Sequence, residues 1–175
     1  MIDASLGRAS CCGFPGGMPQ PVPPVPLPPA EPDAIQIRLA TAQTALANGA
    51  AVPLSSTVRQ IGNGLRLDAA NYAVTVSEPG VYAFSWHVLV QAETDPVIAL
   101  QSLDGRTVLG YSGTLAAAAE NGAVISGTAV AALPAGSAWV LVNASGGTLD
   151  IPVAGTAPAT FSAVLTVTEI SRGRR

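Results

Sequence analysis

From residue 35 onward the chain alternates short apolar runs with clusters of turn residues, a pattern typical of β-strands. The runs are rich in valine, threonine and isoleucine, and they do not keep the 3.6-residue period of an amphipathic helix. The alanine run at 115–119 is too short to change this interpretation. The pattern predicts strands over 35–43, 58–61, 65–67, 72–76, 81–91, 97–103, 108–111, 123–133, 139–143, 148–153 and 160–170.

Turn residues separate these runs at regular intervals. Glycine, asparagine and proline tolerate or impose the backbone angles of tight turns. They stand at Gly62-Asn63-Gly64, Pro79-Gly80, Asp104-Gly105, Asn121-Gly122, Pro134-Ala135-Gly136 and Gly146-Gly147. About ten short strands at this spacing predict an antiparallel sandwich, barrel or jelly roll.

The predicted strand around 81–90, VYAFSWHVLV, is apolar on both faces. One face carries Tyr82, Phe84, Trp86, Val88 and Val90, and the other carries Val81, Ala83, Ser85, His87 and Leu89. A two-sheet sandwich buries one face of each strand in its core. The second face therefore predicts burial against another subunit, and the whole strand is a candidate for the core and for a trimer interface.

Proline marks a different zone before Asp33. Nine of the fifteen prolines lie between Pro15 and Pro32, and a proline-rich segment forms neither a helix interior nor a central strand. The segment over 19–32 predicts an extended polyproline II arm with a reach of roughly 40 Å. Two interpretations stay open: a solvated linker, or an arm that docks on neighbouring subunits. The candidate apolar anchors of the arm are Ile2, Leu6, Phe14, Val22, Val25 and Leu27.

Composition narrows the possible partners. Charged residues make up 11% of the 175 residues, less than half the usual fraction, and the net charge is −3. Because there is no basic field, we expect neither nucleic-acid binding nor attraction to an anionic membrane. No apolar run reaches the length of a spanning helix, so we expect no membrane insertion. The first residues lack the apolar core of a standard secretion signal. We therefore expect a protein at an extracellular or particle surface that leaves the cell by another route or is deposited from inside.

Four segments resemble one known family in order and spacing. They are GVYAFSWHV (80–88), VIALQSLDGRTV (97–108), GTAVAALPAGSAWVLVN (127–143) and ATFSAVLTV (159–167). Together they resemble the strands of the complement globular-head and tumour necrosis factor (TNF) superfamily. Among bacterial members, they most resemble the C-terminal domains of collagen-like exosporium glycoproteins. The resemblance implies an all-β, ten-stranded jelly roll over 34–175 that forms trimers and has no enzyme activity. The chain departs from the pattern because no collagen-like Gly-X-Y tract precedes the head.

Catalytic and metal-binding patterns are absent from the sequence. His87 is the one histidine, and a lone histidine in a strand is more often a packed or interface residue than a catalyst. Glu93 and Asp95 form a close acidic pair that suits either calcium or, more often, solvent. We find no zinc spacing, phosphate loop or nucleophile elbow. The sequence predicts neither a cofactor nor a metal, and it predicts no enzyme.

The two cysteines are adjacent, Cys11 and Cys12, in the arm. A disulfide between neighbours forces a strained ring, so we expect each cysteine to bond to a different chain. Free thiols and metal capture stay open as alternatives. A cysteine pair on an arm before a jelly roll also resembles the connectors of bacterial endospore appendage pilins, although this chain lacks the partner cysteines of their globular domains.

The sequence leaves two functions open. The first is a structural subunit of an extracellular or spore-surface fibre, in which trimeric heads are joined by arms and the main partner is the protein itself. The second is a terminal recognition head, on a spore filament or phage fibre, that binds a glycan or a receptor through its loops. A fibre subunit needs its arm to contact another trimer, whereas a terminal head needs the arm as a tether.

Overall fold

The computed structural model describes residues 31–92, 94–115, 119, 122–152 and 162–172. Within these residues the chain forms twelve strands. They are β1 (Ala34–Leu39), β2 (Gln43–Leu46), β3 (Leu54–Ile61), β4 (Leu65–Asp68), β5 (Ala73–Val76), β6 (Gly80–Val90), β7 (Val97–Ser102), β8 (Val108–Gly113), β9 (Ala123–Leu133), β10 (Ala138–Asn143), β11 (Leu149–Ile151) and β12 (Ala163–Arg172). The described residues contain no helix long and apolar enough to cross a bilayer.

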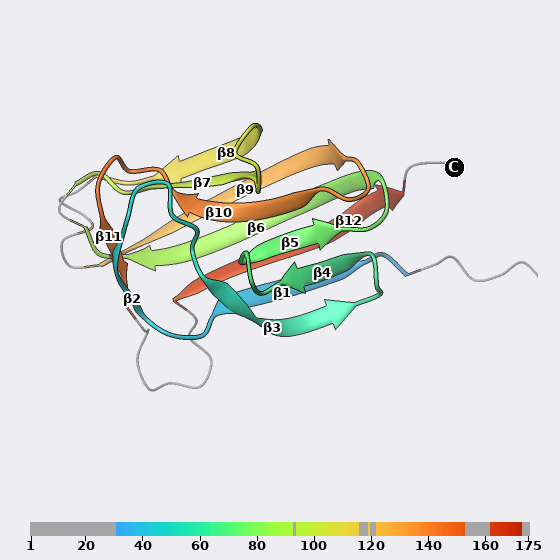
Figure 1. Cartoon of the computed structure of the whole chain (residues 1–175), viewed down its shortest axis with the longest axis horizontal. Helices are drawn as coiled ribbons and strands as arrows, with labels where there is room; N and C mark the ends of the chain where they lie inside the picture. Colours follow the sequence, from blue (N-terminus) through green and yellow to red (C-terminus); the bar gives the residue numbers. More distant parts are fainter. Residues whose placement is uncertain (1–30, 93, 116–118, 120–121, 153–161, 173–175) are drawn as a thin grey trace, which may run out of the picture.

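The strands form two five-stranded sheets and one small pair. Sheet one has the order β3-β1-β12-β6-β9, sheet two has the order β4-β5-β10-β7-β8, and β11 pairs with β2. All these pairs are antiparallel. The first and last strands lie side by side in the middle of sheet one, and the two sheets stack as a sandwich (Figure 1). The prediction of an antiparallel ten-stranded jelly roll is confirmed, with the small pair in addition.

Most strand positions agree with the sequence pattern, and β9 matches its predicted range over 123–133. The first predicted strand, 35–43, is wrong in its extent because the chain forms two strands there. The alternation that buries Ile35, Ile37 and Leu39 ends with β1. Strand β2 then leaves sheet one and pairs with β11, with Leu46 opposite Leu149.

The turns form where glycine was expected. The φ angles are positive at Gly62, Gly105, Gly122, Gly136 and Gly146. A side chain at these angles would be strained, because Cβ then approaches the neighbouring backbone. The predicted turn positions are therefore confirmed for these five glycines.

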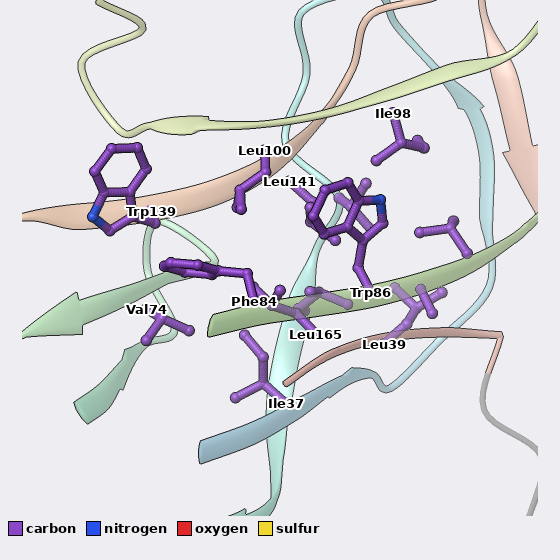
Figure 2. Close-up of a cluster of buried hydrophobic side chains, with 14 of the residues drawn as sticks. Ile37, Leu39, Val74, Phe84, Trp86, Ile98, Leu100, Trp139, Leu141 and Leu165 are labelled. Carbon is purple, nitrogen blue, oxygen red and sulfur yellow. The ribbon is translucent and has the colours of Figure 1, made fainter. Parts of the chain in front are cut away.

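The core lies between the two sheets and centres on the aromatic side chains of β6. Phe84 and Trp139 of β10 meet at a ring-centroid distance of 6.2 Å and an interplanar angle of 60° (Figure 2). Trp86 is 2% exposed, and its indole N–H donates to the Ser112 hydroxyl of β8 at 2.8 Å, which ties the two sheets together. At Gly127 of β9 a Cβ would lie 2.2 Å from the Trp86 ring, so this glycine makes room for the indole.

Candidate functional site

The face of sheet one that points away from the core carries mostly exposed and half-buried side chains, with Val164 of β12 as a buried exception. We call this face the open face. Cross-strand partners share a face, so the register assigns its residues in rows. One row is Arg38, Val164, His87 and Ser126; the next is Arg59, Gln36, Thr166, Ser85 and Thr128; the third is Ile61, Ala34, Thr168, Ala83 and Val130.

Small side chains dominate the open face. On β6 the side chains of Ser85 and His87 are exposed, and those of Val81, Ala83 and Leu89 are half-buried. On β9 the side chains of Val124 and Val130 are 61% and 65% exposed. A flat surface of small apolar and hydroxyl side chains lets another surface approach the backbone closely, because few long side chains must be ordered or desolvated.

The charge of the open face has one sign. Its charged groups are arginines on β1 and β3, and the strands of sheet one place no carboxylate on this face within the described residues. The one acidic residue of these strands, Glu169 of β12, is 4% exposed and belongs to the other side of the sheet. A partner surface that covers the open face would therefore supply carbonyl or carboxylate acceptors for the arginines.

A second group of exposed apolar side chains lies on and next to sheet two. Tyr111 of β8 is 66% exposed, and Leu115, just beyond β8, is 69% exposed. Leu103 and Val108 flank the β7–β8 turn with exposures of 43% and 38%. Tyr111 pairs with Ala99, whose side chain packs in the small apolar cluster outside the main core. One head thus presents two different apolar surfaces.

A buried ionic cluster fixes the point at which the arm enters the head. We call it the Asp33 cluster. The carboxylates of Asp33 and Glu169 are 4% and 2% exposed, and Arg172 of β12 bridges them at 2.9 Å each. The Asp33 amide donates to the Glu169 carboxylate at 3.0 Å, and the Glu169 amide donates to the Asp33 carbonyl at 2.8 Å. The chain just before β1 is thus held along the end of β12.

Two glycines shape this cluster. The amide of Gly64 donates to the Asp33 carboxylate at 3.1 Å. A Cβ at Gly62 would lie 1.7 Å from that carboxylate, and a Cβ at Gly64 would lie 2.3 Å from it. The β3–β4 turn therefore fits around Asp33 because both positions lack a side chain.

The cluster also shifts the pKa values of its neighbours. Hydrogen bonding to Glu169 raises the pKa of the Arg172 guanidinium, and the charges of Glu169 and Asp33 add to this. Burial raises the pKa of the Tyr82 phenol, and the negative charges of Glu169 and Asp33 raise it further. Tyr82 is fully buried and donates its hydroxyl proton to the Glu78 carbonyl at 2.8 Å. Both groups are protonated at neutral pH in any case, and the shifts move their titration to higher pH.

A polar hollow of about 420 Å³ lies next to β11, and Figure 1 shows β11 at the end of the sandwich opposite the start of β1. Its lining includes Gln91, Thr94, Thr148 and Asp150. The Asp150 carboxylate accepts a hydrogen bond from the Ala45 amide at 2.6 Å, so β2 and β11 hold it in place. The hollow thus combines hydroxyl, amide and carboxylate groups, the groups that bind sugar hydroxyls.

Some of the predicted site residues lie within the described residues, and others lie outside them. On β6, the residues Tyr82, Phe84, Trp86 and Val88 are buried in the core, and their alternates lie on the open face. The cysteines and all six arm anchors lie outside the described residues, as does Glu93. Asp95 is described and exposed, and no group of three or more His, Cys, Asp or Glu residues suited to a metal occurs in the described residues.

Sequence reasoning missed the Asp33 cluster. Asp33 lies 136 residues before Glu169 and 139 residues before Arg172, so no local motif unites the three. One signal was present: the alternation of Leu165 and Val167 continues to Glu169 and puts a carboxylate on the core side of the last strand. Because a buried charge needs a partner, this position alone predicts an arginine nearby.

Comparison with known proteins shows the fold. No protein-family model matches the chain, and no curated protein matches it in sequence. Among solved structures, the globular domain of zebrafish complement 1qA is 19% identical, with a TM-score of 0.57, over 81% of this chain and 99% of that one.

Two further structures agree. Eiger TNF from S. frugiperda has a TM-score of 0.63 at 14% identity over 83% of this chain and 97% of its own. Murine APRIL at pH 8.0 has a TM-score of 0.56 at 16% identity over 80% of this chain and 100% of its own. The head has the TNF and complement globular-head fold. At these identities the likeness establishes the fold alone.

Proposed function

We propose that this protein is a structural subunit of an extracellular or particle-surface assembly, in which trimeric heads are joined through their N-terminal arms. The observation that carries the proposal is the open face, a sheet surface with small side chains and exposed Val124 and Val130, to which the described strands contribute no carboxylate. Such a surface is suited to close packing against protein.

The geometry of the contact follows from the two apolar surfaces of the head. The part of the open face on β6 and β9 of one copy meets the group around Tyr111 and Leu115 of the next, and the part on β1 and β3 stays uncovered in this contact. Because these surfaces differ, the contact is heterologous, and a heterologous contact closes into a ring when its rotation permits. The resemblance to TNF-like heads favours a ring of three. Burial of about 1,000 Å² or more per pair is expected for a stable contact.

A charge in the open face tests this assembly. Ala83 is half-buried in the third row of the face, and Ala83→Asp places a carboxylate where the partner packs. We expect the variant to stay folded and monomeric by light scattering. The control is Ala135→Asp in the exposed β9–β10 turn, which should assemble like the wild type. A monomeric mass for the wild type at micromolar concentration would refute the trimer.

The arm supplies the link between trimers in this proposal. All the buried core side chains of the described head lie after Asp33, so deletion of residues 1–32 should leave a folded head. Three arms from one trimer multiply a weak contact, and linked contacts of this kind raise avidity by about 10² to 10⁴. We expect the deletion to abolish fibres seen by negative-stain microscopy and to preserve trimers. Identical fibres after deletion would show that the arm is not the connector.

The cysteine pair is proposed as an intermolecular staple. The double substitution Cys11→Ser with Cys12→Ser should lower the resistance of the assemblies to heat and denaturant. Non-reducing gels of the wild type should show ladders that collapse with reductant. Unchanged resistance in the double variant would leave the cysteines without a structural role.

The polar hollow beside β11 favours a second candidate, a recognition head that binds a glycan or receptor. The hollow lies next to β11, at the end of the head opposite the start of β1 (Figure 1), where a tethered head would present a binding site. Asp150→Ala and Thr148→Ala should abolish binding on a glycan array if this candidate is right. Isolated trimers without fibres in the wild type would move it ahead of the structural role.

A further inference from the structure

A shallow apolar groove lies on the open face between β1 and β3, close to the root of the arm. We call it the β3 groove. It has a volume of about 200 Å³ and is lined by Ala34, Ile35, Gln36, Arg59, Ile61 and Thr166. An apolar cavity of about 150 Å³ holds a benzene-sized group, so the groove has room for a large aliphatic side chain or a proline ring.

We propose that the β3 groove binds the proline-rich arm segment over 19–30 of another copy of this chain. The inference rests on the proposed function and adds the docking site of the arm. The arm is the natural candidate because thirty residues of the chain precede the described part, and this segment is composed of proline with valine and leucine. Its sequence, PQPVPPVPLPPA, contains no charge.

The chemistry of the groove complements that of a polyproline II segment. Such a segment offers backbone carbonyls that have no internal hydrogen bonds, and its prolines lack amide donors. It therefore suits a surface with an apolar floor and hydrogen-bond donors at the rim. Ala34 and Ile61 form part of the floor, while Gln36 and the exposed Arg59 supply donors. Polyproline II segments bind at a low entropic cost because they are already extended.

The donors at the rim are placed for this role. Gln36 donates one amide hydrogen to the Thr166 hydroxyl at 3.3 Å, which orients the side chain along the sheet and leaves its second amide hydrogen for a ligand. No described residue forms an ion pair or hydrogen bond with the Arg59 guanidinium. Five N–H donors at that position are therefore open to carbonyl acceptors.

The exit direction of the arm indicates that the segment comes from another copy. Hydrogen bonds between Asp33 and Glu169 hold the chain alongside the end of β12, and Arg172 contacts the Glu31 carbonyl at 3.5 Å. These contacts hold residues 31–33 at the end of β12, and β12 lies on the other side of β1 from β3. To reach its own groove the arm would have to reverse its direction, which proline-rich segments resist because they stay extended over several residues.

Disulfide trapping tests the docking directly in the full chain. In a Cys11→Ser, Cys12→Ser background, we pair Leu27→Cys in the arm with Gln36→Cys in the groove. The control pairs Leu27→Cys with Arg66→Cys on β4, an exposed position in sheet two. A docked arm holds its thiol near Gln36→Cys at an effective concentration on the order of mM. We therefore expect inter-chain cross-links to form at least about tenfold faster than in the control at micromolar protein.

Two results would overturn the inference. Equal cross-linking rates in the two pairs would mean that the arm does not dock in the groove. A predominance of intra-chain cross-links, which leave the chain monomeric on a denaturing gel, would mean that the arm docks on its own head. A second pair, Leu27→Cys with Ile61→Cys, guards against disruption of the groove by Gln36→Cys and should behave like the first pair.

Groove variants without new cysteines separate this inference from the proposed function. In reductant, Arg59→Ala and Ala34→Trp should keep the trimer mass and lose the higher assemblies, whereas the matched Arg66→Ala should retain both. If the wild type forms no trimer, the proposed function is refuted whatever the groove variants do. If both groove variants form the higher assemblies to the same extent as the wild type, the groove is not the docking site of the arm.

Discussion

The two faces of β6 differ in side-chain size more than in polarity. The face toward the core carries Tyr82, Phe84 and Trp86, each at most 2% exposed. The open face of the same strand carries the half-buried Ala83 and the exposed Ser85. Large rings fill the space between two sheets about 10 Å apart, and small side chains leave a flat surface that another protein can approach.

This difference separates stability from assembly along one strand. Substitutions on the core face should change the free energy of unfolding of a head, because they remove contacts that the head makes with itself. Substitutions on the open face should change the assembled mass and have little effect on the unfolding of a single head. Matched variants on the two faces test that separation.

The largest effect is expected at Trp86. Trp86→Ala removes a buried ring and leaves a cavity, which costs about 3–5 kcal/mol in the free energy of unfolding. The neighbouring Ser85→Ala on the open face should change it by less than about 0.5 kcal/mol. Urea unfolding followed by circular dichroism measures both. Similar costs for the two variants would contradict the separation of the faces.

A smaller cost is expected at the Asp33 cluster. Asp33→Ala removes the acceptor of the Gly64 amide and one carboxylate partner of Arg172. Loss of a buried hydrogen-bond partner costs about 1–3 kcal/mol. The exposed Asp104→Ala is the control and should have a much smaller effect in the same urea titration. Equal effects would mean that the cluster contributes little beyond a surface turn.

The decrease of the free energy of unfolding at alkaline pH is expected to depend on Tyr82. Its pKa is raised in the folded head, so the stability it contributes is complete below the ordinary value of 10.0 and is lost as the pH rises through the folded value. The free energy of unfolding should therefore fall as the pH rises above the ordinary value of 10.0. Tyr82→Phe has no phenol to ionise, and its decline should be shallower. Parallel curves for the two proteins would contradict the shifted pKa.

The smallest change in the free energy of unfolding is expected for a valine-to-threonine substitution on the open face, compared with the same substitution in the core. On the Ala83→Asp background, where self-association does not enter, Val130→Thr on the open face should change the free energy of unfolding by less than about 0.5 kcal/mol. Val88→Thr in the core buries a hydroxyl and should cost about 1–3 kcal/mol. Differential thermal melts compare them, and equal shifts would mean that the open face is packed within the head.

Much of the fold was predictable from the sequence because turns and alternation are local signals. The alternation of β6 assigned Trp86 and His87 to opposite faces but left open which face is the core, and the structure places the aromatic rings in the core. The split between β1 and β2 was not predictable, since it depends on the pairing of Leu46 with Leu149, about a hundred residues away.

The candidate sites were harder to predict for the same reason. The open face could be anticipated from the alternating residues of β6, but its width depends on which strands lie beside β6. The β3 groove exists because Ile61 and Thr166 lie on either side of β1, and their pairing is set by sheet topology. The sequence alone showed that β6 is apolar on both faces, but it could not show which strands lie beside β6.

The position of β1 has a mechanical consequence. Tension on the arm reaches the head at Asp33 and pulls β1 along its own axis, while β3 and β12 hold it from both sides. A strand pulled along its axis loads the hydrogen bonds of both ladders together, whereas a strand peeled from its end breaks them one at a time. The buried carboxylates at the entry point add resistance where the strain is greatest. An arm attached in this way transmits force into the middle of a sheet, so a chain of such heads would extend little before it breaks.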